Sequence, residues 1–242
     1  MHDYFLAELY RLLHKKSLYL YFAGLAGAYV LLAYIRSGGF TETSVLRDGE
    51  NLFFYLPILA GGFLFAGIYI DDLTAGNLSA LVGYGLSKWK IVTVKLALTA
   101  LFNGLLYGLA PVLHIGLYRL LGSVAAQGGW RAVYGLSVKY WLMTLGFSAL
   151  CGIIVYGLQR GTFAFVAYVL LAFGMVGGLL TTALKGFAPG LTRFLMSPIT
   201  DGILSGIING SPLLPPLLSY LVYLTGAAAL SVLAFHKKEM AF

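Results

Sequence analysis

Charged residues are scarce in this sequence. Only 10% of its 242 residues are Asp, Glu, Lys or Arg, whereas a soluble domain carries about 25%. Hydrophobic residues make up 60% of the chain, and the mean hydropathy is +0.86. Uncharged stretches of about twenty residues recur along the chain, and a helix of that length crosses a hydrocarbon core of about 30 Å. The composition therefore excludes a soluble globular protein and predicts an integral membrane protein.

Motifs for metal binding and catalysis are also missing. The single cysteine, Cys151, lies in an apolar stretch, which favours a packing role and excludes an intrachain disulfide. The histidines are scattered, and no H-E-x-x-H pattern is present. Only His114 falls within an expected span, where a hydrogen bond to a neighbour is a more common role than metal ligation. We therefore expect no metal site and no catalytic residue.

A motif for nucleotide binding or for ion coupling is missing as well. The nearest glycine-lysine stretch, GYGLSK at 83–88, lacks the spacing of a nucleotide-binding loop. The expected spans contain no Asp or Glu, although ion-coupled transporters keep such residues at membrane depth. The chain is therefore expected not to be an enzyme by itself, and any transport by it needs energy from elsewhere.

The apolar stretches predict an all-α fold with six membrane-spanning helices, so that the chain 1–242 forms a single transmembrane domain. The third stretch is long enough to tilt or project beyond the hydrocarbon core, and we expect Lys95 to snorkel to the interface there. The expected spans cover residues 17–35, 52–70, 91–118, 140–158, 162–184 and 214–235.

Two segments outside the spans have their own patterns. Residues 2–16 (HDYFLAELYRLLHKK) place leucines on one helical face, with Glu8 and Arg11 largely off it. This pattern is typical of an amphipathic helix in the membrane interface. Residues 187–212 combine Pro and Gly with many Leu and Ile, which predicts an extracellular region of short re-entrant pieces.

The basic residues set the expected orientation. They lie at the ends of apolar stretches rather than in one patch, which favours lipid headgroups over nucleic acid as their partners. Two clusters, Lys15-Lys16 and Lys237-Lys238, adjoin span ends on the same side. The positive-inside rule therefore places both termini and residues 71–90 in the cytoplasm.

Residues 71–90 (DDLTAGNLSALVGYGLSKWK) form the most informative polar stretch. Asp71 and Asp72 stand where acids stabilise a helix N-terminus. Either Gly83 or Gly85 is suited to end that helix, and Ser87 is suited to cap the next one. We therefore expect a short helix within 72–88 that lies along the membrane and is anchored by two spans.

This stretch resembles the permease subunits of type-2 ATP-binding-cassette (ABC) transporters, which are mostly exporters. In that family, an acidic residue and a Gly-Thr/Asn-Leu triplet follow the second span, and Ser-Arg/Lys then precedes a helix that bears a lysine. Asn77 and Lys88 stand where Thr and Arg are commoner. The amphipathic N-terminal helix, the six spans, the re-entrant region and the terminal FHKKE at 235–239 extend the similarity over nearly the whole chain. The matching positions here are Asp72, Gly76-Asn77-Leu78, Ser87-Lys88 and Lys95.

The resemblance implies a permease that works with a second permease copy, identical or related, and with two cytoplasmic ATPase subunits that bind ATP and Mg²⁺. The 72–88 helix is then the coupling helix, beside an elbow helix at 2–16. The implied location is a cell membrane, in particular a bacterial plasma membrane. The residues implied in coupling are Asp71, Asp72, Gly76, Asn77, Leu78, Ser87, Lys88, Glu8 and Arg11.

Simpler interpretations of the same residues stay open. Acids such as Asp71 and Asp72 are also typical of the solvated end of a span. Lys88 is equally suited to fix the orientation of the chain in the membrane. A membrane scaffold or immunity protein that binds cargo without pumping is the alternative function. A membrane-embedded enzyme is a third class, for which the sequence offers no set of residues.

Aromatic residues suggest what is moved. They form 15% of the chain and include 17 tyrosines. Tyr29, Tyr55 and Tyr168 lie deep in expected spans and are candidates for the substrate path. A path of aromatic and aliphatic groups suits an antimicrobial or cytolytic peptide, a hydrophobic drug or a lipid, and the sequence does not choose among them.

Overall fold

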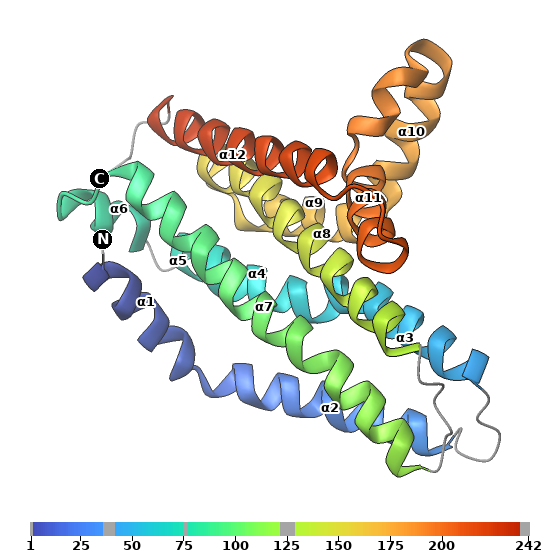
Figure 1. The fold of residues 1–242 in the computed structure, drawn as a ribbon. Coiled ribbons are helices and arrows are strands. Elements are labelled where there is room, and N and C mark those ends of the chain that lie inside the picture. The colour runs from blue at the N-terminus through green and yellow to red at the C-terminus, as the bar shows by residue number, and fades with distance from the viewer. Residues whose placement is uncertain (1, 36–41, 75–76, 122–128, 238–242) are drawn as a thin grey trace.

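The computed structural model describes residues 2–35, 42–74, 77–121 and 129–237, and within these ranges every regular element is a helix (Figure 1). Five helical segments are long and apolar enough to cross a membrane, and a bent pair of helices adds a sixth if it counts as one span. An all-helical, polytopic membrane architecture, as the composition predicts, is therefore confirmed. The five segments are Lys16–Ile35, Val45–Leu73, Lys88–Leu120, Gly129–Leu158 and Leu214–Lys237.

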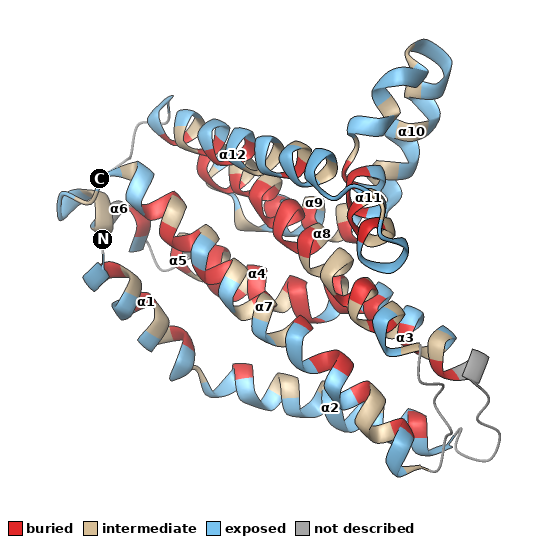
Figure 2. Cartoon of the chain, in the orientation of Figure 1, coloured by how far each residue is buried: buried red, intermediate tan, exposed pale blue. Residues whose placement is uncertain are grey.

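Helix α8 (Gly129–Leu158) lies at the centre of the bundle (Figure 2). Helices α7 (Lys88–Leu120), α11 (Met196–Asn209) and α12 (Leu214–Lys237) pack along it. Glycines permit the close approach: a β-carbon at Gly135 would lie 2.8 Å from Leu204 Cδ1, and one at Gly152 would lie 3.2 Å from Ser231 Oγ. Small residues at helix contacts are the usual means of packing in membranes.

The second span is one long helix with two π-helical turns. It runs through α3 (Glu42–Leu56), η2 (Pro57–Gly61), α4 (Gly62–Phe65), η3 (Ala66–Ile70) and α5 (Asp71–Thr74). The first π-turn begins at a proline, and the Tyr168 hydroxyl donates a hydrogen bond of 2.9 Å to the Pro57 carbonyl. The same carbonyl accepts from the Gly62 backbone N–H, so Tyr168 adds a second donor to it at membrane depth, where water is absent.

The expected single helix over 162–184 needs correction, because the chain breaks there. Helix α9 (Gly161–Ala172) and helix α10 (Met175–Phe187) meet at an angle of 65°. Gly174 lies between them with φ of 72°, a backbone conformation that glycine adopts readily. The 12 residues of α9 span only about 18 Å, which is too short to cross a bilayer. Helix α10 has no buried residue and projects away from the body of the molecule in Figure 1.

The segment that was expected to be re-entrant consists of a 3-10 turn, η4 (Pro189–Phe194), and α11. Helix α11 turns its buried residues, among them Met196 and Ile203, towards α8. An ion pair of 2.5 Å between Lys139 Nζ and Asp201 Oδ1 joins the two helices.

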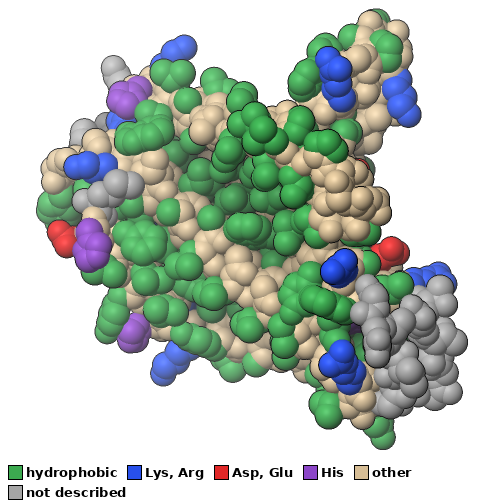
Figure 3. Space-filling view, in the orientation of Figure 1, with side chains coloured by type: hydrophobic (Ala, Val, Ile, Leu, Met, Phe, Trp, Pro, Cys, Tyr) green, Lys and Arg blue, Asp and Glu red, His purple; other side chains and the backbone are tan. Residues whose placement is uncertain are grey.

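The two ends of the bundle are distinct. Helices α1 (His2–Leu13) and α6 (Asn77–Gly83) lie at the same end as the last turn of α12 (Figure 1). The start of α3 meets the last turns of α7 at the opposite end. Hydrophobic side chains cover most of the face in Figure 3, and basic side chains lie towards its ends.

The packing around the first π-turn predicts that two neighbouring glycines differ in how well they tolerate substitution by alanine. An added β-carbon at Gly61 would lie 2.3 Å from the Tyr168 hydroxyl and 2.8 Å from Thr144 Cγ2, whereas at Gly62 the nearest atom lies 3.6 Å away. We expect Gly61→Ala to displace Tyr168 from the Pro57 carbonyl and to destabilise the protein by about 1–3 kcal/mol. Gly62→Ala is the matched control and should be neutral or slightly stabilising. Thermal unfolding in detergent checks this, and equal midpoints for the two variants would contradict the geometry.

Candidate functional site

A buried lysine joins three helices at the end of the bundle that holds α1. Lys95 of α7 has 1% of its surface exposed. Its Nζ donates a 2.7 Å hydrogen bond to Glu8 Oε2 of α1 and a second bond to Asp72 Oδ2 of α5. Glu8 and Asp72 are themselves buried. Lys95 therefore connects the N-terminal helix and the end of the second span to the start of the third.

Two further cations extend this contact. Arg11 Nη2 lies 2.9 Å from Glu8 Oε2 and 3.5 Å from Asp72 Oδ1, and it donates to the Gly67 carbonyl at 3.3 Å. Lys15, just beyond α1, pairs with Asp71. We call these six residues the charge junction: Glu8, Arg11, Lys15, Asp71, Asp72 and Lys95.

The charge junction balances three carboxylates with three cations, so its formal charge is zero. Burial of an ion is costly, but each ion here has an opposite charge within reach. Part-burial lowers the pKa of the Arg11 guanidinium, but the Asp72 and Glu8 carboxylates raise it more, and the net shift is upward. Loss of a single partner leaves an uncompensated charge, whereas the complete set fixes the three helices relative to one another.

The charge junction corrects two expectations about exposure. Lys95 does not snorkel to the interface, because Glu8 and Asp72 meet it inside the protein. Glu8 does not lie on a solvated face of the N-terminal helix, because α1 turns Tyr4, Glu8 and Leu12 inward. These three residues are spaced four apart, so they share one helical face, and this spacing could have indicated the buried face. The acid in the middle of the three made that face look solvent-exposed.

Unpartnered polar atoms surround the carboxylates. Among the described residues, the hydroxyls of Tyr4 and Tyr156 and the Asp72 Oδ1 atom are buried without a hydrogen bond. Burial and then the negative charges of Glu8 and Asp72 raise the pKa of the Tyr4 phenol, so it stays neutral at physiological pH. The Asp72 Oδ1 atom thus has an ion pair with Arg11 but no hydrogen bond.

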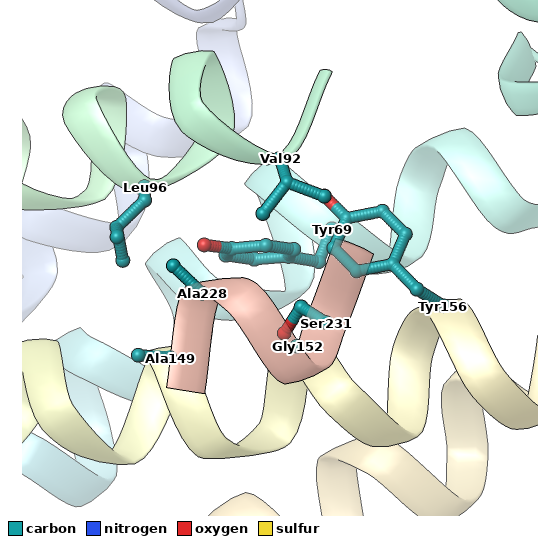
Figure 4. Close-up of a pocket in the computed structure, with 8 residues that line it drawn as sticks. All are labelled: Tyr69, Val92, Leu96, Ala149, Gly152, Tyr156, Ala228 and Ser231. Carbon is teal, nitrogen blue, oxygen red and sulfur yellow. The ribbon is translucent and has the colours of Figure 1, made fainter. Parts of the chain in front are cut away.

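A small cavity adjoins this region between η3, α7, α8 and α12 (Figure 4). The rings of Tyr69 and Tyr156 form one part of its wall, and Gly152 and Ser231 lie across from them. Its volume is about 10 Å³, which is room for about one water molecule. The cavity is therefore too small to hold cargo.

The expected single helix over 72–88 is replaced by shorter pieces. Asp71 and Asp72 begin α5, which ends at Thr74, and α6 covers Asn77–Gly83. Leu78 is buried in the main core, while Asn77 is exposed. Gly76 lies outside the described residues. Buried Leu78 holds α6 against the body, while Asn77 and Ala80 of the same helix are exposed.

Ser87 and Lys88 lie where the chain passes from α6 into α7. Ser87 occupies the N-cap position of α7, as expected, but its side chain makes no capping bond. Lys88 Nζ donates 2.7 Å to the Phe235 carbonyl near the end of α12 and lies 5.2 Å from the centre of the Phe235 ring. Lys88 therefore ties α7 to α12. Residues 238 and 239 of the terminal FHKKE motif lie outside the described residues.

The three candidate path tyrosines have different surroundings. Tyr168 is fully buried and bonds the Pro57 carbonyl. Tyr29 bonds His114 at the opposite end of the bundle from the charge junction. Tyr55 is 51% exposed on the outside of the second span. The structure therefore does not bring these three side chains together.

No model of a known protein family matches the chain, and no curated protein is similar enough to assign it to one.

The charge junction predicts a large effect of removing its central cation. Lys95→Met leaves the Asp72 and Glu8 carboxylates without their shared partner, and we expect a loss of about 3–5 kcal/mol in the free energy of unfolding. Lys90→Met is the matched control, because Lys90 is an exposed lysine in the first turn of the same helix, α7, and it should change stability by less than about 0.5 kcal/mol.

A double variant separates charge from packing. Lys95→Met combined with Asp72→Asn removes one charge of each sign and leaves Glu8 paired with Arg11. We therefore expect the double variant to be more stable than Lys95→Met alone, when thermal or denaturant unfolding is measured. Additive losses would contradict an ionic contact between Lys95 and Asp72.

Proposed function

We propose that this chain is the permease subunit of an ATP-driven ABC exporter, energised by a separate cytoplasmic ATPase. The charge junction is the observation that carries the proposal. It fixes an N-terminal surface helix, the polar end of the second span and the start of the third span to one another. A force applied to this end of the bundle therefore reaches two spans and the helix that precedes the first.

Helix α6 is the part of this end that a soluble partner is best placed to bind. It turns Leu78, Leu81 and Val82 towards the core and leaves Asn77 and Ala80 exposed. Tyr84 follows directly and is 87% exposed. An exposed tyrosine beside small residues is a common feature of protein interfaces, where tyrosines contribute much of the binding energy.

The arrangement of the anchors supports the transfer of motion. Before α6, the chain is held by Asp72 in the charge junction, and after it by Lys88 at the end of α12. A partner that displaces α6 must therefore move these anchors with it. On this proposal, closure of the ATPase on bound ATP and Mg²⁺ tilts the spans and opens a path between two permease copies.

The resemblance to type-2 permeases supports export and the pairing of two copies, and the proposed side for α1 and α6 is the cytoplasm. The class of cargo is amphipathic or hydrophobic, in keeping with apolar spans. Helices α2 and α12 turn large apolar side chains such as Leu31, Leu32 and Val222 outward, and these faces are available to lipid, cargo or a second copy.

Truncation of the exposed tyrosine tests the proposed contact. We expect Tyr84→Ala to weaken binding of the ATPase about tenfold or more, because loss of an interface tyrosine commonly costs 2 kcal/mol. Stability should not change. Tyr34→Ala is the matched control, since Tyr34 is also exposed but lies at the other end of α2 from α1, and it should not affect binding.

The measurement is purification of the tagged chain from membranes of its source cell, with identification of any ABC ATPase and assay of ATP hydrolysis in the complex. Equal capture by Tyr84→Ala and wild type would reject α6 as the contact. Cargo binding with no ATPase at all would favour the alternative of a scaffold or immunity protein that does not pump.

A further inference from the structure

Three hydroxyl groups line the small cavity between the second span, α7, α8 and α12 (Figure 4). They belong to Tyr69 of η3, Tyr156 of α8 and Ser231 of α12, and all three residues are buried. The rest of the lining consists of aliphatic residues and a glycine. Polar groups from three helices are therefore gathered on the wall of one otherwise apolar cavity.

These hydroxyls have unused hydrogen-bonding capacity. The Tyr156 hydroxyl is buried and makes no hydrogen bond to the described part of the chain. The Tyr69 oxygen lies 3.3 Å from the Thr99 hydroxyl oxygen. The Ser231 hydroxyl, like the other two, can donate one bond and accept two. The rings of Tyr69 and Tyr156 pack edge to face with their centres 6.4 Å apart, but their hydroxyls do not bond each other. A buried hydroxyl without a partner is unfavourable, so this arrangement favours a small ligand that bonds to them.

A glycine leaves the space for such a ligand. A β-carbon at Gly152 would lie 3.2 Å from Ser231 Oγ and 3.8 Å from Tyr156 Cε2, so a side chain at this position would fill the gap between the two residues. With glycine there, the cavity has a volume of about 10 Å³. A cavity of this size admits one water molecule, and it excludes a larger ligand.

The chemistry of the wall distinguishes water from a metal ion. None of the described residues that line the cavity is acidic, whereas a bound metal ion is surrounded by several oxygen ligands that usually include carboxylates. A buried water molecule needs only two to four polar partners. It has two hydrogens and two lone pairs, which are enough for bonds to all three hydroxyls. The lining therefore suits a neutral ligand that both donates and accepts.

We propose that this cavity is a binding site for one ordered water molecule, which joins Tyr69 of the second span to Tyr156 of α8 and Ser231 of α12. The water completes the hydrogen bonding of the Tyr156 hydroxyl and replaces a direct bond between the two tyrosines. This inference concerns a single chain and holds whether or not an ATPase binds at the charge junction.

The site is linked to the charge junction through two short segments of chain. Tyr69 lies three residues before Asp72 and belongs to the second π-turn, a geometry that is frequent at functional sites. Thr99, which contacts Tyr69, donates a 2.8 Å hydrogen bond to the Lys95 carbonyl. The water therefore attaches the two spans that carry Asp72 and Lys95 to α8 and α12.

Two conservative variants remove partners of the water and add no atom. Tyr156→Phe and Ser231→Ala each delete one hydroxyl, and thermal unfolding of the full chain is measured in detergent. With water bound, each variant loses a hydrogen bond, and we expect its midpoint to fall by about 2–4 °C. The double variant should lose less than the sum, because the two hydroxyls bind the same water molecule. Tyr34→Phe is the matched control, since Tyr34 is 65% exposed, and it should not change the midpoint.

A dry cavity would give different results. Each hydroxyl would then be a buried polar group without a ligand, and its removal would leave the midpoint unchanged or raise it. An unchanged or raised midpoint in either single variant would therefore reject the site. Losses that simply add in the double variant would reject a water molecule shared by Tyr156 and Ser231.

The direct measurement is a cryo-electron microscopy map of the full chain, bound to an antibody fragment, at a resolution that shows ordered water molecules. We expect density for one water molecule within hydrogen-bonding distance of the Tyr69, Tyr156 and Ser231 oxygens, and none in the double variant. An empty cavity in a wild-type map that shows other buried water molecules would overturn the proposal. Density that appears only when sodium or potassium is added would also overturn it, because the ligand would then be a cation.

Discussion

The contact of one buried lysine with two carboxylates is the constraint on which this end of the molecule depends. Lys95 lies in the third span, Glu8 in the N-terminal helix and Asp72 at the end of the second span. A lysine in an apolar environment is unfavourable alone, and so are the two acids. Together, and with Arg11 and Lys15, they form a neutral set that is stable only when the three helices keep their relative positions.

This constraint gives a mechanical basis for the proposed function. The segment between the second and third spans is held before α6 by Asp72 and after it by Lys88. Its middle, α6, packs through Leu78 and exposes Asn77 and Ala80. The residues of this segment thus divide into anchors and a proposed contact surface, although the sequence presents them as one motif.

The general architecture follows from the sequence, and the site does so only in part. Long apolar stretches predict spans because the bilayer admits few alternatives, and each of the five continuous spans covers an expected range and extends beyond it at one end or both. The fifth expected span is bent by 65° rather than straight, because Gly174 adopts a left-handed backbone conformation there, which a hydropathy pattern does not contain. The pairing of Lys95 with Glu8 was not predicted from the sequence, because the two residues are 87 positions apart and each alone is typical of an interface. His114 was expected to be a hydrogen-bonded histidine, and this expectation is confirmed.

The most direct test of the account is a cryo-electron microscopy structure of the chain purified with the ATPase that we propose as its partner. The account predicts ATPase density at the end formed by α1, α6 and the last turn of α12, with Asn77, Ala80 and Tyr84 covered and Lys95 still bonded to Asp72. Density at the end formed by the start of α3 and the last turns of α7, or a bound ATPase that leaves α6 uncovered, would contradict it.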